Sequence, residues 1–154
     1  MISGIDTTFL VELEIEEAEH HAAARKFLEE RIVTGREELA MAPQVLAEFV
    51  HVVTDPRRFS RPLDVAAAVA RAGFWWHARE VRRVVPTAET TDLFLAWMTG
   101  LGLGRKRILD TLLAATYSSA GIDRILTTNA RDFAVFEGIT AVMPGEARGA
   151  SRGR

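Results

Sequence analysis

Four carboxylates lie where active sites are commonly found in parallel sheets, just beyond predicted strand ends or near the start of the helices that follow. They are Asp6, Glu48, Asp110 and Asp132. Ligands of open α/β sheets bind beyond the carboxyl ends of the strands, so these side chains are expected to converge. Converging carboxylates repel one another unless a cation neutralises them, and oxygen ligands without cysteine favour Mg²⁺ or Mn²⁺ over zinc.

Each of these acids also has a purely structural explanation. Asp6 can cap the helix that follows it. Glu48 borders an apolar helical stripe and can be a solvated flank residue. A negative charge at Asp110 suits the dipole of the helix it helps to begin, and the segment 129–132 resembles a capping box. Taken singly, none of these residues identifies a site.

The elements that must position the acids alternate between strand and helix. Apolar runs predict strands over 1–5, 39–42, 81–85, 124–128 and 139–143. Helical spacing predicts helices within 7–32, and over 44–54, 63–79, 88–101, 108–120 and 130–136. Pro43 suits the first turn of one helix, and Gly121 suits the end of another. This alternation predicts an α/β fold, with helices on both faces of a mostly parallel central sheet of about five strands.

Length and composition limit the class of protein. The chain has 154 residues, 48% of them hydrophobic and 26% charged, which is typical of one soluble globular domain. It has no cysteine, which excludes disulfides, thiolate zinc sites and a cysteine nucleophile. No apolar run approaches the ~18 residues of a membrane helix, and the acidic N-terminus is unlike a signal peptide, so a cytoplasmic protein is expected. We expect one domain over 1–144 and a flexible tail over 145–154.

The charge is unevenly distributed. Residues 1–50 carry 11 acids and 4 bases, whereas residues 51–110 carry 10 bases and 6 acids. Of the 19 bases, 17 are arginines, which either reflect a GC-rich genome or suit phosphate recognition. The candidate phosphate-binding residues are Arg57, Arg58, Arg61, Arg105, Lys106 and Arg107. Solvated loop charge is the other explanation for each of them.

Other residue types give weaker indications. Trp75 and Trp76 either stack on nucleic-acid bases or belong to the core or an interface. The histidines, which are His20, His21, His51 and His77, have no spacing that indicates a metal site.

Four segments together resemble a known family. They are Ile5-Asp6-Thr7-Thr8, Leu46-Ala47-Glu48-Phe49, the run 108–116 (ILDTLLAAT) and the run 126–133 (LTTNARDF). In this order and spacing they resemble the PIN domain, and within it the VapC ribonuclease toxins of type II toxin–antitoxin systems. The resemblance extends from Met1 to about Pro144, and its last two segments are the more specific ones. It implies a PIN-like three-layer α/β/α fold.

The resemblance also implies a function and its residues. The family's acidic quartet falls on Asp6, Glu48, Asp110 and Asp132. The implied activity is that of an endoribonuclease in which a Mg²⁺-activated water hydrolyses an RNA phosphodiester, with Mn²⁺ as a possible substitute. Asp6 and Asp110 would bind the ion directly, and Asp132 would bind it or, together with Glu48, its waters or a second ion. Thr8 stands where the family often has Asn or Ser, and Asn129 matches a neutral polar residue of many members.

The implied partners are an RNA substrate and a VapB-type antitoxin, with a homodimer and a toxin–antitoxin hetero-oligomer as assemblies. Phe9, Leu10, Trp75 and Trp76 exceed what a small core obviously needs and are candidates for these interfaces. Two other functions stay open: a housekeeping PIN nuclease in RNA processing, and a catalytically inactive binding module. A receiver-like phosphoacceptor domain is disfavoured, because neither lysine of the chain follows a late strand.

Overall fold

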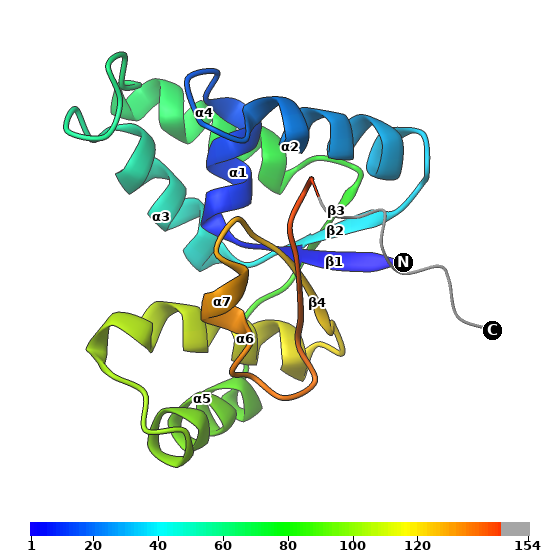
Figure 1. Ribbon diagram of the computed structural model, residues 1–154, viewed down its shortest axis with the longest axis vertical. Helices are drawn as coiled ribbons and strands as arrows, with labels where there is room; N and C mark the ends of the chain where they lie inside the picture. The colour runs from blue at the N-terminus through cyan, green and yellow to red at the C-terminus, as the bar shows by residue number, and fades with distance from the viewer. Residues whose placement is uncertain (146–154) are drawn as a thin grey trace.

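The central element of the protein is a parallel five-stranded sheet between two layers of helices (Figure 1). The computed structural model describes residues 1–145, so the predicted tail lies outside the described residues except for Gly145. The strands are β1 (Ile2–Ile5), β2 (Glu38–Met41), β3 (Val81–Arg83), β4 (Arg124–Leu126) and β5 (Thr140–Val142). Their order is β3-β2-β1-β4-β5 and every pairing is parallel. The predicted three-layer α/β/α fold is confirmed.

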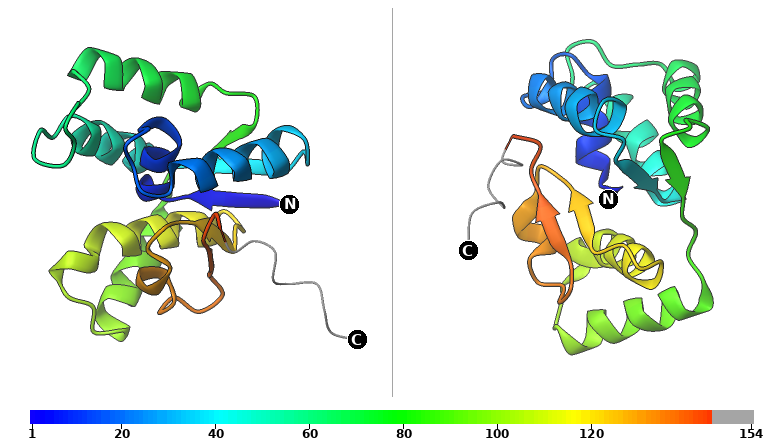
Figure 2. Two further views of the ribbon diagram at one scale, coloured as in Figure 1. Left: turned by 45° about the horizontal axis from the view of Figure 1, so that its top comes forward. Right: turned by 90° about the vertical axis from the view of Figure 1, so that its right-hand side faces the viewer.

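The helices divide between the two faces of the sheet according to strand order (Figures 1 and 2). One face carries α1 (Thr7–Glu14), α2 (His21–Phe27), α3 (Pro43–Val53) and α4 (Val65–Trp76). The other carries α5 (Ala88–Gly100), α6 (Ile108–Ser119) and α7 (Ala130–Phe133). The chain steps outward from β1 to β3, then returns to the opposite side of β1 for β4. Right-handed crossovers therefore place the later helices on the opposite face.

Several predicted boundaries are wrong in detail. The helical region 7–32 is interrupted after α1, because Ile15 has extended backbone angles, and α2 continues into a π-helical turn over Leu28–Val33. The helix predicted over 63–79 is shorter at both ends. The strand predicted over 124–128 ends at Leu126, and the backbone N of Thr128 donates to the Thr8 hydroxyl instead of continuing a sheet ladder.

Two predicted helix signals are confirmed. Pro43 occupies the first turn of α3. Gly121 lies just beyond α6 with a φ of 72°, a conformation that glycine adopts without the penalty of a Cβ. No helix within residues 1–145 has the length and apolar character needed to cross a membrane.

Tyr117 of α6 ties that helix to the carboxyl end of two strands. Its side chain is fully buried, and its hydroxyl donates to the carbonyl oxygens of Ile5 (2.7 Å) and Ala40 (3.1 Å). Burial raises the pKa of this phenol, so it stays a neutral donor. Its ring lies against Gly4, where a Cβ would come within 2.5 Å of ring carbon. The position of β1 relative to α6 is therefore fixed just before Asp6.

We predict that Gly4→Ala lowers the free energy of unfolding by about 1–3 kcal/mol, because the new methyl group overpacks against the Tyr117 ring. The matched control is Gly73→Ala in α4, where nothing lies within 4 Å of the added Cβ. The control is expected to stabilise by up to about 1 kcal/mol, the difference in helix propensity between glycine and alanine. Urea unfolding of both variants measures the effect, and equal stabilities would contradict this account of Gly4.

Candidate active site

Asp6 lies at the carboxyl end of β1 and is the N-cap of α1. Its side chain is almost fully buried. Oδ1 accepts a hydrogen bond from the backbone N of Thr7 (2.7 Å), and Oδ2 accepts from the hydroxyls of Thr8 (2.9 Å) and Thr127 (2.8 Å). Asp6 thus caps a helix, as one of its two interpretations predicted, and it also lines a cavity. Thr127 was not predicted as a site residue. It lies next to Asp6 because it follows β4, which pairs directly with β1.

Burial raises the pKa of Asp6 above its ordinary value. The hydrogen bonds from Thr127, Thr8 and Thr7 act in the opposite direction because they favour the charged form, and the charge of Glu48 raises the pKa further. A carboxylate in this position is costly to ionise. It is therefore stabilised by any cation that approaches from the cavity.

Glu48 is held in place by the residue that follows Asp6. The buried hydroxyl of Thr7 donates to Glu48 Oε2 at 2.9 Å. Glu48 is half-buried on α3, whose buried face, which includes Val45 and Phe49, holds the helix in the core. Glu48 does border the apolar stripe of α3, but its side chain is half-buried and hydrogen-bonded, so it is not freely solvated. Thr7 is a second residue that the sequence analysis missed, and its only signal was a hydroxyl next to a buried acid.

Asp110 lies in the first turn of α6, as predicted, with 28% of its side chain exposed. Its pKa is raised to about 6, first by burial and then by the charges of Asp6 and Asp132. The guanidinium of Arg107 lowers it, and Glu48 adds a smaller upward effect. The other three acids of the quartet, which come from three distant segments, are thus close enough to perturb Asp110.

Asp132 belongs to the short helix α7 and has 43% of its side chain exposed. The capping box predicted for this segment is absent, since the Asn129 side chain makes no capping bond. Instead the Asn129 backbone N donates to Thr127 Oγ1 (2.9 Å), and its carbonyl oxygen accepts from the Asp132 backbone N (2.9 Å). The chain after β4 is therefore fastened to the hydroxyl that also bonds Asp6.

A cavity of about 350 Å³ brings these groups together beyond the carboxyl end of β1. Its polar walls are formed by Asp6, Thr7, Thr8, Glu12, Glu48, Arg58, Asp110, Thr128, Asn129 and Asp132, and its apolar walls by Val11, Val52 and Phe59. A smaller cavity of about 30 Å³ shares four lining residues with it, which are Asp6, Thr7, Glu48 and Asp110. The predicted quartet and both supporting polar residues thus line one cavity. The four histidines, all within the described residues, are not among its walls.

The groups in this cavity suit a hard divalent cation. They offer carboxylate and hydroxyl oxygens and no thiol, which is the ligand set that Mg²⁺ and Mn²⁺ prefer. Their mutual repulsion also favours a bound cation. Within residues 1–145, no three acidic or histidine side chains already stand close enough to enclose a metal ion. Metal binding would therefore require these side chains to close toward the ion.

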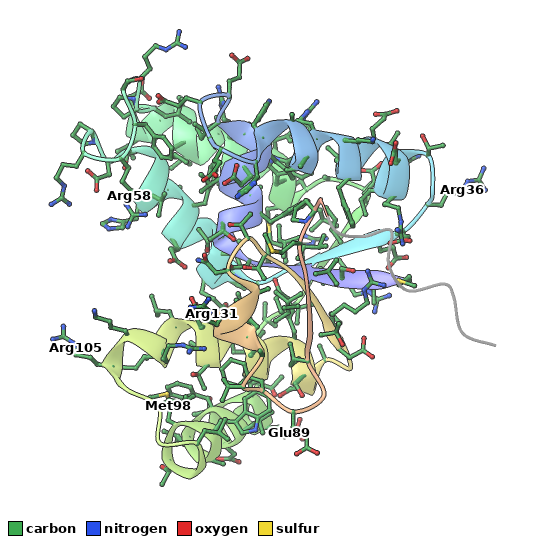
Figure 3. The ribbon with its side chains drawn as sticks, viewed as in Figure 1. Arg36, Arg58, Glu89, Met98, Arg105 and Arg131 are labelled. Carbon is green, nitrogen blue, oxygen red and sulfur yellow. The ribbon has the colours of Figure 1, made fainter. Side chains whose placement is uncertain are left out.

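The predicted phosphate-binding arginines after α3 differ in orientation. Arg57 does not line the cavity, and its Nε and Nη2 donate to the two oxygens of Asp55, each at 3.1 Å. Arg58 lines the cavity wall and lies only at the edge of ion-pair distance from Asp55, at 3.9 Å. In Figure 3, Arg58 lies on the side of the molecule toward which β1 runs, and Arg36 lies on the opposite side. Of Arg57 and Arg58, Arg58 is therefore the better placed to bind a substrate in the cavity.

The bases before α6 also differ from one another. Arg105 and Lys106 are exposed, and Arg105 lies on the same side of the molecule as Arg58 (Figure 3). Arg107 is partly buried and approaches two acids of the site, with Nε 3.6 Å from Asp110 Oδ2 and Nη1 3.9 Å from Asp132 Oδ1. All three were predicted as candidate phosphate-binding residues, with solvated loop charge as the other explanation for each. The structure gives Arg107 carboxylate neighbours instead.

Most of the apolar residues predicted for interfaces belong to the core. Phe9 and Leu10 are fully buried, and Trp75 is 5% exposed with its indole N–H donating to Glu14 Oε1 at 2.6 Å. The interface prediction for these three residues is wrong, because α1 and α4 pack into the same core cluster. Trp76 is half-buried beside the Arg83 guanidinium. The exposed large apolar residues of α4 are Val65, Val69 and Phe74.

Comparison with known proteins agrees with this arrangement. The PIN domain family model matches residues 5–138. Ribonuclease VapC24 of Mycobacterium tuberculosis is 29% identical over 137 residues, which cover 86% of this chain and 90% of that protein.

Several solved structures have a similar fold. VapBC2 of Rickettsia felis, bound to a promoter DNA fragment, has a TM-score of 0.67 at 16% identity, covering 93% of this chain and 98% of that chain. VapC20 of Mycobacterium tuberculosis, described as a toxin that cleaves the sarcin–ricin loop, has a TM-score of 0.64 at 20% identity, covering 91% and 99%. VapBC-1 of nontypeable Haemophilus influenzae has a TM-score of 0.64 at 16% identity, covering 94% and 98%. At these identities the likeness shows the fold.

We predict that Asp110→Asn stabilises the metal-free protein at neutral pH. A carboxyl whose pKa is raised to about 6 in the folded state destabilises that state once it ionises, so the parent loses stability as pH rises from about 4 to above 6. The variant should unfold with a free energy higher by about 1–2 kcal/mol above that range and equal below it. Thermal unfolding in EDTA across this pH range measures the difference. Asp92→Asn, at an exposed carboxylate of α5, is the control, and a variant no more stable than the control would contradict the crowding of charge at Asp110.

Proposed function

Because this chain belongs to the PIN domain family, we propose that it is a metal-dependent endoribonuclease, acting in the cytoplasm as the toxin of a type II toxin–antitoxin pair. The observation that carries the proposal is the convergence of the four acids on one cavity. Asp6 follows β1, whereas the other three acids belong to α3, α6 and α7, and packing alone gives no reason to gather four like charges. The ribonuclease name of the VapC24 relative supports the same activity.

The proposed reaction is hydrolysis of an RNA phosphodiester, which leaves a 5′-phosphate and a 3′-hydroxyl. Asp6, Asp110 and Asp132 would hold Mg²⁺ or Mn²⁺, an ion that activates water and offsets negative charge on the phosphate. The hydroxyls of Thr8 and Thr127 keep the Asp6 carboxylate in a single orientation.

Glu48 and the cavity wall complete the proposed site. The hydroxyl of Thr7 orients Glu48, which is thus able to accept a hydrogen bond from the attacking water. Arg58 in the wall would pair with a phosphate next to the scissile bond, and exposed Arg105 and Lys106 would contact the strand further out. The attacking group of the proposed reaction is water, so no side chain needs to act as a nucleophile.

The proposed protein partner is a VapB-type antitoxin. The names of the R. felis and H. influenzae structures describe VapBC pairs, which supports a partner of this class for the present chain. The exposed apolar residues of α4 provide surface that a partner would cover. We also propose a homodimer within the hetero-oligomer.

We predict that the purified protein cleaves total RNA only with a divalent cation, and that Asp6→Asn and Asp110→Asn each reduce cleavage by at least ~100-fold while keeping the wild-type circular dichroism spectrum. Mapping of the cut ends with and without EDTA measures this. Asp64→Asn is a matched control, because Asp64 caps α4 through a hydrogen bond from the Ala67 N (2.7 Å) and lies outside the cavity. Asn serves nearly as well as Asp at a cap, so the control should stay active. Full cleavage in EDTA, or by Asp110→Asn, would refute the metal-dependent mechanism.

We predict that Arg58→Gln weakens RNA binding several-fold and reduces the slope of log K against log salt by about 1, the loss of one phosphate contact. Binding is measured by fluorescence anisotropy in EDTA, which prevents cleavage. Arg36→Gln removes the same charge on the far side of the molecule and should leave the salt slope unchanged (Figure 3). Identical slopes for the two variants would show that Arg58 does not contact the RNA backbone.

A further inference from the structure

Arg107 is a cation that the protein itself places beside two acids of the site, although it is not among the residues that line the cavity. It immediately precedes α6, and its guanidinium lies between Asp110 on that helix and Asp132 on α7, at 3.6 Å and 3.9 Å from their nearest oxygens. Its side chain is 25% exposed. Residues 105–107 therefore do not form one solvent-facing basic cluster, since Arg105 and Lys106 are exposed and Arg107 turns inward.

Charge rather than hydrogen bonding holds the Arg107 side chain in this position. Both distances exceed hydrogen-bond length, and two buried nitrogens of the guanidinium, Nε and Nη2, have no hydrogen-bond partner. Burying such donors without partners costs free energy, so the attraction of the two carboxylates must compensate for it. The backbone of Arg107 is fixed independently, because its carbonyl oxygen accepts from the Thr111 hydroxyl at 2.6 Å.

We propose that Arg107 is a positioning residue which neutralises Asp110 and Asp132 while the site holds no divalent cation, and which competes with a divalent cation for these two carboxylates. This inference rests on the proposed function, because it assumes that both acids are metal ligands. Attraction of the carboxylates to a divalent ion weakens their attraction to the guanidinium, so the two cations bind competitively. Arg107 thus reduces like-charge repulsion in the metal-free site and lowers the affinity of the site for metal.

The competition predicts opposite effects on stability and on metal affinity. Without metal, Arg107→Gln leaves the two carboxylates without their neutralising charge, so the thermal midpoint falls. With saturating Mn²⁺ the ion supplies that charge, and the midpoint returns to that of the parent. The affinity of the variant for Mn²⁺ should rise by about five- to tenfold, because the competing cation is gone. A residue that only supported the fold would lower the midpoint equally in both conditions.

The test measures Mn²⁺ dissociation constants by electron paramagnetic resonance, together with thermal midpoints in EDTA and in Mn²⁺, on full-length protein. The matched control is Arg105→Gln, which removes an equal charge two residues away from an exposed side chain. Arg107→Lys is a second variant, which keeps the charge and so preserves the fold. Because its compact ammonium cannot span both carboxylates, its Mn²⁺ affinity should lie between those of the parent and of Arg107→Gln.

The outcomes separate this inference from the proposed function. Tighter Mn²⁺ binding in Arg107→Gln than in Arg105→Gln, with a midpoint deficit that Mn²⁺ removes, supports the inference. Equal affinities in the two glutamine variants, or a deficit that persists in Mn²⁺, overturn it while leaving the nuclease proposal intact. A parent protein that binds no Mn²⁺ overturns both. If Arg107→Gln fails to fold, Arg107→Lys decides, and an affinity equal to that of the parent overturns the inference.

Discussion

Burial of the Asp6 carboxylate at the end of β1 is the constraint on which the rest of the structure depends. A charge removed from water is costly unless hydrogen bonds and a nearby cation compensate. Two donors, the Thr7 N and the Thr8 hydroxyl, come from the helix that Asp6 caps, and the third, Thr127, follows β4. The third donor requires β4 to pair directly with β1, which is the point where the strand order reverses. The pairing of β1 with β4 is therefore both a feature of the sheet topology and the reason why Thr127 reaches Asp6.

The packing around Asp6 restrains the backbone at the place where the acidic side chains repel one another. Tyr117 anchors α6 to the ends of β1 and β2, so Asp110 on the same helix cannot move away from Asp6 by a shift of the helix. The crowding appears in the pKa of Asp110, which burial and the neighbouring acids raise to about 6. An arrangement of this kind lowers the stability of the empty protein and suits the binding of a cation. Its cost indicates that function rather than folding selects these side chains.

Much of the fold and the quartet follow from the sequence, because they depend on local patterns. Short apolar runs and helical spacing located each strand and most helices, and Gly121 has the positive φ expected of its position beyond a helix. The resemblance to the PIN domain, now matched over residues 5–138, predicted that the four acids share one site, and all four line one cavity. The interface assignment of Phe9 and Leu10 failed because sequence alone does not show how many helices share a core. Four helices pack on one face here, so both side chains are covered.

By itself the sequence determined the succession of strands and helices along the chain, the acidic residue types and the absence of thiol ligands. Each of these is a property of neighbouring residues or of composition. Only the tertiary structure decided that Thr7 and Thr127 orient two of the acids, that Arg58 faces the cavity whereas Arg57 turns to Asp55, and that Arg107 lies between Asp110 and Asp132. These contacts join segments far apart in the chain or choose between adjacent, chemically equal side chains. The direction of each side chain depends on strand pairing and on the sum of the charges around it. Neither can be read from the local sequence pattern.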